Sequence, residues 1–350
     1  MNAFPRRSVS WFGRLLRVAA VLLTGLAAQA AAVLNVCTST PDLESLAKEV
    51  GGARVRVVCF SSGPEDPHEI ELKPSFSREL EKADLYLQVG LGLENAWLER
   101  LMQTVKNAGV KPGQPGNLNL SQGVRLLEGE EGRPQPGSFH EEGNPHYLLD
   151  PLEGLKAARA IRDRLATLRP EWREEFGRNH AALALRLGTL MVGAACAASD
   201  DVEKLLLEWE GLKTPAETKA FQERHALGGW MAALAAYRGK AFVGDHDLWP
   251  YFARRTGLTV LGYLEPSPGV SPTTPHLQGL IGRMKESKTT LVLMAPYFDG
   301  RHAEFVAKRT GARVVGMAHQ TGGRPGTASY VDMVTFNMGN LLKGLQEGGR

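Results

Sequence analysis

Short runs of apolar, mostly β-branched residues alternate along this chain with segments whose apolar residues recur at the spacing of a helix. In the first third, the pattern predicts strands at 33–38, 54–60 and 85–89, and helices at 41–50 and 75–83. The alternation returns later, with strands predicted at 241–244, 259–263, 290–294 and 313–317 and helices at 249–256, 275–286, 301–310 and 330–346. Such alternation is typical of parallel sheets covered by helices, so the predicted fold class is α/β with two parallel-sheet lobes.

A purely helical pattern separates the two alternating regions. One helix is predicted at 151–168, and Pro170 suits the first turn of the next. If that second helix continued to about Ala197, it would be roughly 40 Å long. At 350 residues the chain is too long for a single ordinary core. We therefore expect an N-terminal lobe at 32–169, a rigid linking helix at 170–197 and a C-terminal lobe at 198–350, with a Gly- and Pro-rich loop at 111–144.

The first 31 residues have the pattern of a secretory signal peptide. A basic stretch precedes an apolar run at 18–28, and Ala28-Gln29-Ala30 supplies a small-x-small cleavage site. The run is too short to span a bilayer, and the alternative is a buried N-terminal helix. No Leu-x-x-Cys lipid-attachment pattern precedes Cys37. We therefore expect a free periplasmic protein, exported by the general route or, given Arg6-Arg7, by the twin-arginine route.

Removal of this leader changes the charge of the chain. The sequence has 41 basic and 38 acidic residues, and the leader holds four arginines and no acid, which leaves 37 basic residues. A mature chain so near neutrality has no overall electrostatic field to attract nucleic acid, so nucleic acid is not an expected partner.

Three cysteines are too few to hold the fold by disulfides. Cys37 and Cys59 either pair with each other, or these two and Cys196 are simply small buried apolar residues.

Four of the nine histidines stand in loops beside predicted strands or helices. His68 follows the second strand, His146 precedes the helix at 151–168, and His246 and His319 each come just past a strand. Ligands of open α/β sheets bind beyond the carboxyl ends of strands, so these loops are expected to meet in a cleft between the lobes. Neutral imidazole is the commonest metal ligand in proteins, and four such nitrogens suit tetrahedral Zn²⁺. A lone loop histidine is more often solvated, so the joint placement is what indicates a metal site.

The sequence around these histidines resembles the solute-binding proteins of zinc and manganese ABC importers. Asp66-Pro67-His68-Glu69 with Pro74-Ser75 resembles the first ligand segment of that family, and Asn144-Pro145-His146-Tyr147 with Asp150-Pro151 resembles the second. The stretch 246–258 is similar to the third segment. Later stretches at 265–268, 311–315 and 330–337 look like further parts of the family in the right order, so the resemblance covers 33–345.

This resemblance implies two α/β lobes joined by a rigid helix, with one metal ion bound between them as cargo. It implies that His68 and His146 are ligands from the N-terminal lobe and that His246 is the third ligand. Manganese-type members usually have a carboxylate at the third position, so His246 favours Zn²⁺ over Mn²⁺. His319 occupies the fourth position, where the family commonly has Asp or a gap. The implied partner is an inner-membrane ABC permease with its ATPase, and the receptor is expected to be a monomer.

Several residues depart from the family pattern or have an open role. Leu148 stands where Trp is usual, and Trp249-Pro250 and Ala295-Pro296 replace Phe-Gly and Glu-Pro. His140, with Glu141 and Glu142, is either a reduced metal-collecting loop or a plain solvated loop. Asp150 and Asp247 are candidates to hold the ligand imidazoles by hydrogen bonds, although capping of the next helix is the expected role of Asp247.

The sequence also leaves two alternative functions open, a different metal cargo and a hydrolase. The same fold with Mn²⁺ or Fe²⁺ as cargo would favour carboxylate ligands over imidazoles. A secreted zinc hydrolase would need an open coordination position and a placed general base. His68-Glu69 lacks the second histidine of a His-Glu-x-x-His protease motif, and no catalytic residue is predicted. The expected protein is a binding protein and not an enzyme.

Overall fold

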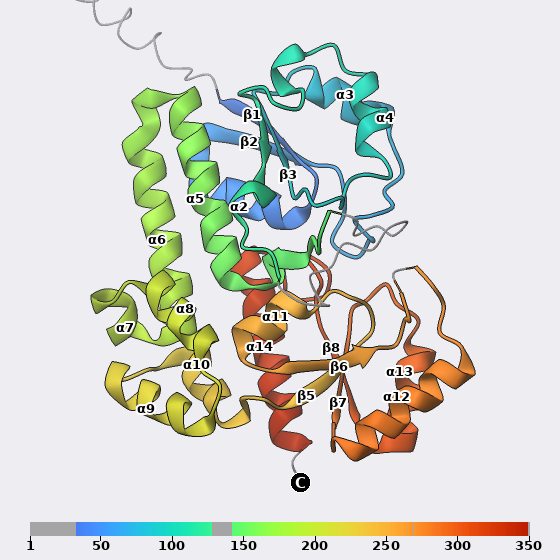
Figure 1. Cartoon of the computed structure of the whole chain (residues 1–350). Helices are drawn as coiled ribbons and strands as arrows, with labels where there is room; N and C mark the ends of the chain where they lie inside the picture. The colour runs from blue at the N-terminus through green and yellow to red at the C-terminus, as the bar shows by residue number, and fades with distance from the viewer. Residues whose placement is uncertain (1–32, 128–141, 268, 349–350) are drawn as a thin grey trace, which may run out of the picture.

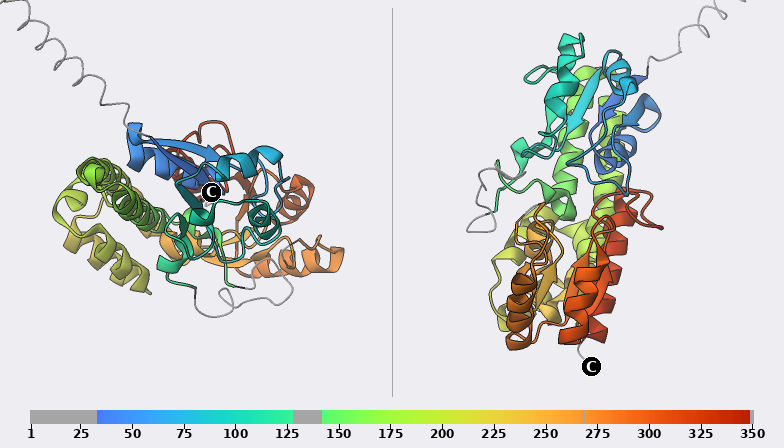
Figure 2. Two further views of the ribbon diagram at one scale, coloured as in Figure 1. Left: turned by 90° about the horizontal axis from the view of Figure 1, so that it is seen from above. Right: turned by 90° about the vertical axis from the view of Figure 1, so that its right-hand side faces the viewer.

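The computed structural model describes residues 33–127, 142–267 and 269–348. The predicted leader and His140 lie outside these residues. Two α/β lobes are stacked one above the other, and two long helices run along one side of the molecule (Figure 1). The right-hand view of Figure 2 shows the same stacking of the two lobes, and the left-hand view looks down on it from above. Within the described ranges, no helix combines the length and apolar character needed to cross a membrane.

The N-terminal lobe contains a four-stranded parallel sheet. Its strands are β1 (Leu34–Thr38), β2 (Val55–Cys59), β3 (Leu85–Gln88) and β4 (Asn117–Asn119), in the order β2-β1-β3-β4. The helices of this lobe are α2 (Pro41–Gly51), α3 (Pro74–Leu80) and α4 (Leu98–Gln103). The loop predicted at 111–144 is interrupted by β4, and that part of the prediction was wrong. β4 is only three residues long, with two asparagines, so no apolar pattern marks it.

The C-terminal lobe repeats this topology. Its parallel strands are ordered β6-β5-β7-β8, the same relative order as in the first sheet. The strands are β5 (Ala241–Gly244), β6 (Thr259–Tyr263), β7 (Leu291–Met294) and β8 (Arg313–Gly316), and the helices are α11 (Pro250–Thr256), α12 (Thr274–Glu286), α13 (Gly300–Thr310) and α14 (Tyr330–Glu347). All eight predicted elements are confirmed to within about one residue, because each apolar run is a buried strand or one face of a helix.

Helices α5 (Pro151–Leu168) and α6 (Arg173–Val192) form the antiparallel pair along the side of the molecule. Phe176, Leu183 and Leu187 lie on one buried stripe of α6. The expectation of one unbroken helix to Ala197 was wrong. The chain turns at Gly193, which has φ 87°, and a Cβ there would lie 2.8 Å from the Cα of Gly228. The 20 residues of α6 span about 30 Å, and α6 still packs on α2 in one lobe and on α10 in the other.

Four helices lie between α6 and β5; the first overlaps the end of the predicted linking helix, and the other three had no counterpart in the prediction. They are α7 (Ala194–Ser199), α8 (Val202–Gly211), α9 (Pro215–His225) and α10 (Gly229–Leu234). In Figure 1 they lie beside the lower ends of α5 and α6. The first part of the predicted C-terminal lobe is therefore entirely helical. The most polar of the four, α9, buries only Thr218 and Phe221, so its sequence carries little helical periodicity.

One apolar core runs through both lobes. It contains residues of the first sheet such as Leu87, residues of α5 and α6, and residues of the second lobe such as Phe242 and Tyr330. Tyr330, on α14, donates a hydrogen bond of 2.7 Å from its hydroxyl to the carbonyl of Leu148 in the N-terminal lobe. The two lobes are therefore joined by a shared apolar core and by hydrogen bonds such as this one.

The three cysteines are free thiols, so the predicted alternative of a Cys37–Cys59 pair was wrong. β1 and β2 are neighbours, but their register places Cys37 opposite Val58 and Cys59 opposite Thr38. Successive side chains of a strand point to opposite faces, so the two sulfurs cannot meet. Cys37 and Cys196 are buried, and Cys59 is partly exposed.

Candidate metal centre

His68 lies in the turn that follows β2 and is almost completely buried. Its Nδ1 is 2.7 Å from a carboxylate oxygen of Asp66, and the same oxygen accepts a 3.0 Å hydrogen bond from the His68 backbone amide. Burial alone would raise the pKa of Asp66, but the hydrogen bonds and charge of His68 hold it below its usual value. An ionised carboxylate only accepts, so Nδ1 of His68 is the donor in this contact, and Nε2 is the nitrogen through which this ring would ligate a metal.

His246 has the same arrangement in the other lobe. Its Nδ1 is 2.8 Å from a carboxylate oxygen of Glu265. The register of the second sheet explains this contact, because Gly244 at the end of β5 pairs with Tyr263 at the end of β6. His246 and Glu265 each stand two residues beyond that pair and come to lie side by side. Carboxylates that orient an imidazole in this way are typical neighbours of metal-bound histidines.

His146 approaches from the N-terminal lobe, in a short 3₁₀ helix at His146–Leu149. The side-chain oxygen of Asn144 accepts a 2.9 Å hydrogen bond from the His146 backbone amide. The side-chain nitrogen of Asn144 donates a 2.7 Å hydrogen bond to the carbonyl of Asp247. One buried asparagine therefore joins the His146 segment to the His246 segment.

These contacts bring the rings of His68, His146 and His246 together. Their centroids are 5.1 Å apart for His68 and His146, 5.9 Å for His146 and His246, and 6.2 Å for His68 and His246. A tetrahedral Zn²⁺ at about 2.0–2.1 Å from each nitrogen places ligand ring centroids roughly 5 Å apart. The pair within the N-terminal lobe matches this separation, and both distances to His246 exceed it by about 1 Å. Among the described residues, no set of three or more His, Cys, Asp or Glu side chains is already closed around one point.

His319 lies beside this group and is also buried. Its Nε2 is 3.0 Å from the carbonyl of Glu65, so that nitrogen is the donor and Nδ1 carries the lone pair. Nδ1 is buried and makes no hydrogen bond to any residue that the structure describes. The ring of Tyr297 packs edge-on against it at 4.6 Å. Burial, partly offset by the Glu65 carbonyl, lowers the pKa of His319 to about 4, so the ring is neutral at neutral pH.

A small cavity of about 30 Å³ connects this region to the other histidines, because both His146 and His319 line it. A cavity of that size holds about one water molecule. His319 contacts the N-terminal lobe through the carbonyl of Glu65, and its neighbour Gln320 donates to the carbonyls of Ser62 and Gly63. The His319 loop therefore packs against the loop of the N-terminal lobe that carries His68.

Asp247 and Asp150 were both candidates to hold the ligand imidazoles, and Asp247 was expected to cap the next helix. Asp247 does not cap α11, because that helix begins at Pro250 after Trp249 and has no side-chain cap. The prediction was wrong because the chain makes a further turn before the helix. Asp150 caps α5, accepting a 2.9 Å hydrogen bond from the backbone amide of Leu152, and makes no direct contact with a candidate ligand that the structure records. Glu265, which sequence reasoning did not assign to His246, is the carboxylate found there.

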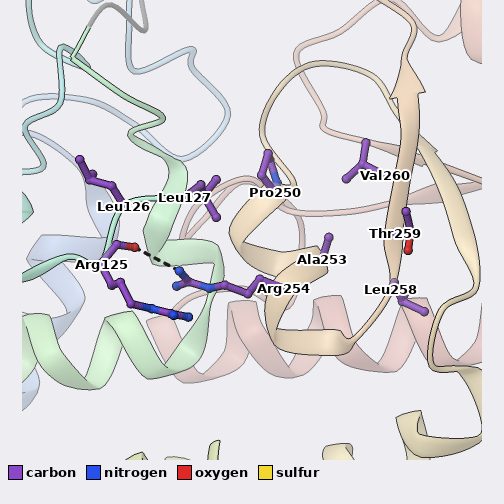
Figure 3. A pocket seen from close by; sticks show the side chains of 9 residues that line it. All are labelled: Arg125, Leu126, Leu127, Pro250, Ala253, Arg254, Leu258, Thr259 and Val260. Atoms are coloured by element: carbon purple, nitrogen blue, oxygen red, sulfur yellow. Dashed lines mark hydrogen bonds between the residues drawn. The ribbon is translucent and has the colours of Figure 1, made fainter. Parts of the chain in front are cut away.

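A surface groove of about 330 Å³ lies near the site but contains none of the four histidines. Figure 3 shows Arg254, on α11, reaching toward Arg125, whose carbonyl accepts a 3.1 Å hydrogen bond from it. Leucine, valine and proline side chains form much of the remaining lining. Apolar side chains and guanidinium groups do not ligate cations, so this groove is not a candidate metal site.

Comparison with known sequences agrees with this geometry. The sequence model of the family described as zinc-uptake complex component A, periplasmic, matches residues 36–193 and 216–344. The chain belongs to this family. A zinc-binding lipoprotein AdcA of Streptococcus pneumoniae is 24% identical over 286 residues, which cover 81% of this chain and 50% of the relative. The chain thus spans about half the length of that relative.

Other relatives match over most of their length. The high-affinity zinc uptake system protein ZnuA of Yersinia pestis is 24% identical over 316 residues, which cover 87% of each chain. Among solved structures, one titled crystal structure of ZnuA has a TM-score of 0.65 and 24% identity, and the match covers 89% of this chain and 99% of that one. The structural likeness confirms the predicted two-lobed α/β fold.

Proposed function

We propose that this chain is a periplasmic receptor that captures one Zn²⁺ ion between its lobes and delivers it to an ABC-type permease with its ATPase. The observation that carries the proposal is the meeting of three imidazoles from both lobes, with ring centroids 5.1–6.2 Å apart. Membership of a zinc-uptake family supports it. The proposed ligands are His68, His146 and His246, with His319 as the fourth.

The donor set favours zinc over manganese. Imidazole nitrogen suits Zn²⁺, whereas Mn²⁺ prefers carboxylate and carbonyl oxygens. The carboxylates of Asp66 and Glu265 are each hydrogen-bonded to an imidazole Nδ1. They orient nitrogen ligands and do not replace them. A site dominated by oxygen ligands, as Mn²⁺ or Fe²⁺ cargo would require, is less well supported.

The same contacts argue against a zinc hydrolase. A hydrolase needs a general base beside an open coordination position. The carboxylates of Asp66 and Glu265 face two of the candidate ligands, and each is engaged with a histidine Nδ1. A site of three or four imidazoles fits capture and transfer better than catalysis.

Competition between the metal-free mature chain and a chromophoric chelator tests the proposal. We expect one Zn²⁺ per chain, bound at least about a hundred-fold more tightly than Mn²⁺. The variant His146→Ala should lose most of this affinity. His225→Ala is the matched control, since that histidine lies on α9, where its ring contacts Phe221, and its loss should leave the zinc affinity unchanged. Equal or tighter binding of Mn²⁺ would overturn the assignment of zinc as cargo.

A further inference from the structure

An arginine is completely buried where the two lobes meet. Arg255, on α11, has a side-chain exposure of 0%. Its Nε donates to one carboxylate oxygen of Asp150 at 2.8 Å and its Nη2 donates to the other at 3.1 Å. Asp150 is also 0% exposed and belongs to the N-terminal lobe. This fork of two parallel hydrogen bonds fixes both the distance and the orientation of the carboxylate.

Asp150 stands between Arg255 and a candidate ligand. It follows directly after the 3₁₀ helix at His146–Leu149, and its backbone amide donates a 2.9 Å hydrogen bond to the carbonyl of Tyr147. The oxygen that Arg255 Nε contacts also accepts from the Leu152 amide at the start of α5. A displacement of Asp150 would therefore displace the turn that carries His146.

The other side of Arg255 is held by α8. Its Nη2 donates to a carboxylate oxygen of Glu210 at 2.6 Å, and its Nη1 donates to the carbonyl of Leu206 at 2.9 Å. The indole nitrogen of Trp209 donates to the backbone carbonyl of Arg255 at 3.0 Å. Residues 194–215, which include α8, fall between the two stretches that match the family. This support for Arg255 is thus supplied by a segment outside the matched parts of the chain.

We propose that Arg255, held by Glu210, is a positioning residue that keeps the His146 turn in place for metal capture. The inference rests on the proposed function, because it assigns a role at the same site. Burial of an ion pair is often no more stabilising than apolar side chains of equal volume. The paired geometry at Asp150 is therefore better explained by orientation of the turn than by stability alone.

The test compares Arg255→Lys with Arg238→Lys. Arg238 is the matched control because it also contacts α8, donating to the carbonyls of Trp209 and Leu212, but does not contact Asp150. Zinc affinity is measured for each variant in the parent chain and in a His146→Ala background. We expect Arg255→Lys to weaken zinc binding roughly ten-fold in the parent and less than about two-fold in the His146→Ala background. Arg238→Lys should lower the melting temperature and leave the affinity unchanged.

A weakening of equal size in both backgrounds, or no weakening at all, would overturn the positioning role. Hydrogen exchange of the metal-free protein supplies a readout that does not depend on the cargo. The peptide covering residues 144–152 should exchange faster in Arg255→Lys than in Arg238→Lys. Glu210→Gln, which keeps the shape of the side chain, should show the same change to a smaller extent if Arg255→Lys does not fold.

These readouts separate the two proposals. If the parent takes up no zinc but exchange in 144–152 rises in Arg255→Lys, the cargo is wrong and the positioning of the turn stands. If the parent binds zinc through His146 and the exchange rate is the same in both arginine variants, the role of Arg255 is wrong and the receptor function stands.

Discussion

The side-chain nitrogen of Asn144 donates a 2.7 Å hydrogen bond to the backbone carbonyl of Asp247, across the boundary between the two lobes. Because the side-chain oxygen of Asn144 also accepts from the His146 amide, this residue ties the His146 backbone to the residue next to His246. The spacing of two imidazoles from different lobes is thereby set by one buried amide group.

Substitution Asn144→Ala should weaken zinc binding by about ten-fold or more. It removes both hydrogen bonds and leaves the His146 amide without its acceptor, and an unsatisfied buried polar group costs about 1–3 kcal/mol. Asn117→Ala is the control, since Asn117 is also buried and hydrogen-bonded but lies on β4. Chelator competition should show a loss only for Asn144→Ala. An equal loss of affinity in both variants would mean that general destabilisation is responsible.

The carboxylates at Nδ1 should also control affinity. Glu265→Gln presents an amide whose nitrogen can donate to His246 Nδ1, which would favour the tautomer with its proton on Nε2. We expect zinc affinity to fall by about 10–100-fold, and Asp66→Asn should have a similar effect through His68. The measurement is a zinc titration at neutral pH, with circular dichroism to confirm folding. Unchanged affinity in both variants would show that neither imidazole is oriented by its carboxylate for metal binding.

His319 supplies the fourth ligand in the proposed site, through Nδ1, because Nε2 is bonded to Glu65. His319→Ala should therefore weaken zinc binding substantially and admit one water molecule to the metal. His319→Asp should retain zinc but reduce the preference over Mn²⁺, since a hard oxygen replaces nitrogen. If His319→Ala binds zinc as tightly as the parent, the fourth position belongs to water or to another residue.

Asp42 gives a pH dependence that is separate from the histidines. It is buried on α2 and accepts hydrogen bonds from the backbone amide and hydroxyl of Thr321 at 2.7 and 2.6 Å. Burial, partly offset by these hydrogen bonds, raises the pKa of Asp42 from 3.8 to about 6. The folded chain therefore keeps a proton that the unfolded chain releases between about pH 4 and 6, and this contribution to stability is lost as the pH rises through that window.

The substitution Asp42→Asn isolates this effect, because an asparagine side chain does not titrate. The free energy of unfolding of the parent, relative to that of Asp42→Asn, should fall by up to about 3 kcal/mol between about pH 4 and 7. Urea denaturation of the metal-free proteins at several pH values measures this difference. A difference that does not change with pH would contradict the raised pKa.

Much of this architecture is predictable from local pattern. The strands and helices of both sheets follow from apolar periodicity, because each run packs on one face. The contact between His246 and Glu265 does not follow, since it depends on the pairing of Gly244 with Tyr263 in the neighbouring strand. Asp247 is adjacent to His246 in sequence, yet the carboxylate at His246 Nδ1 is that of Glu265. The register of β5 and β6, and not closeness in sequence, therefore determines that Glu265 contacts His246.

The break at Gly193 shows a different limit. The residues at 194–198 are mostly alanine and favour a helix, and glycine inside a helix is tolerated in many proteins. What ends α6 is the close approach of Gly228, from the start of α10, which leaves no space for a Cβ. That approach is a tertiary contact. Helix α9 was not predicted for a different reason, since only Thr218 and Phe221 are buried and the apolar periodicity of its sequence is weak.

Anomalous diffraction at the zinc absorption edge, from crystals of the mature chain grown with one equivalent of Zn²⁺, tests the central proposal most directly. The proposal predicts a single strong peak about 2.0–2.1 Å from Nε2 of His68 and of His246 and from one ring nitrogen of His146. His319 Nδ1 should lie at the fourth position. A peak bound mainly by carboxylates, or a peak away from these histidines, would contradict it.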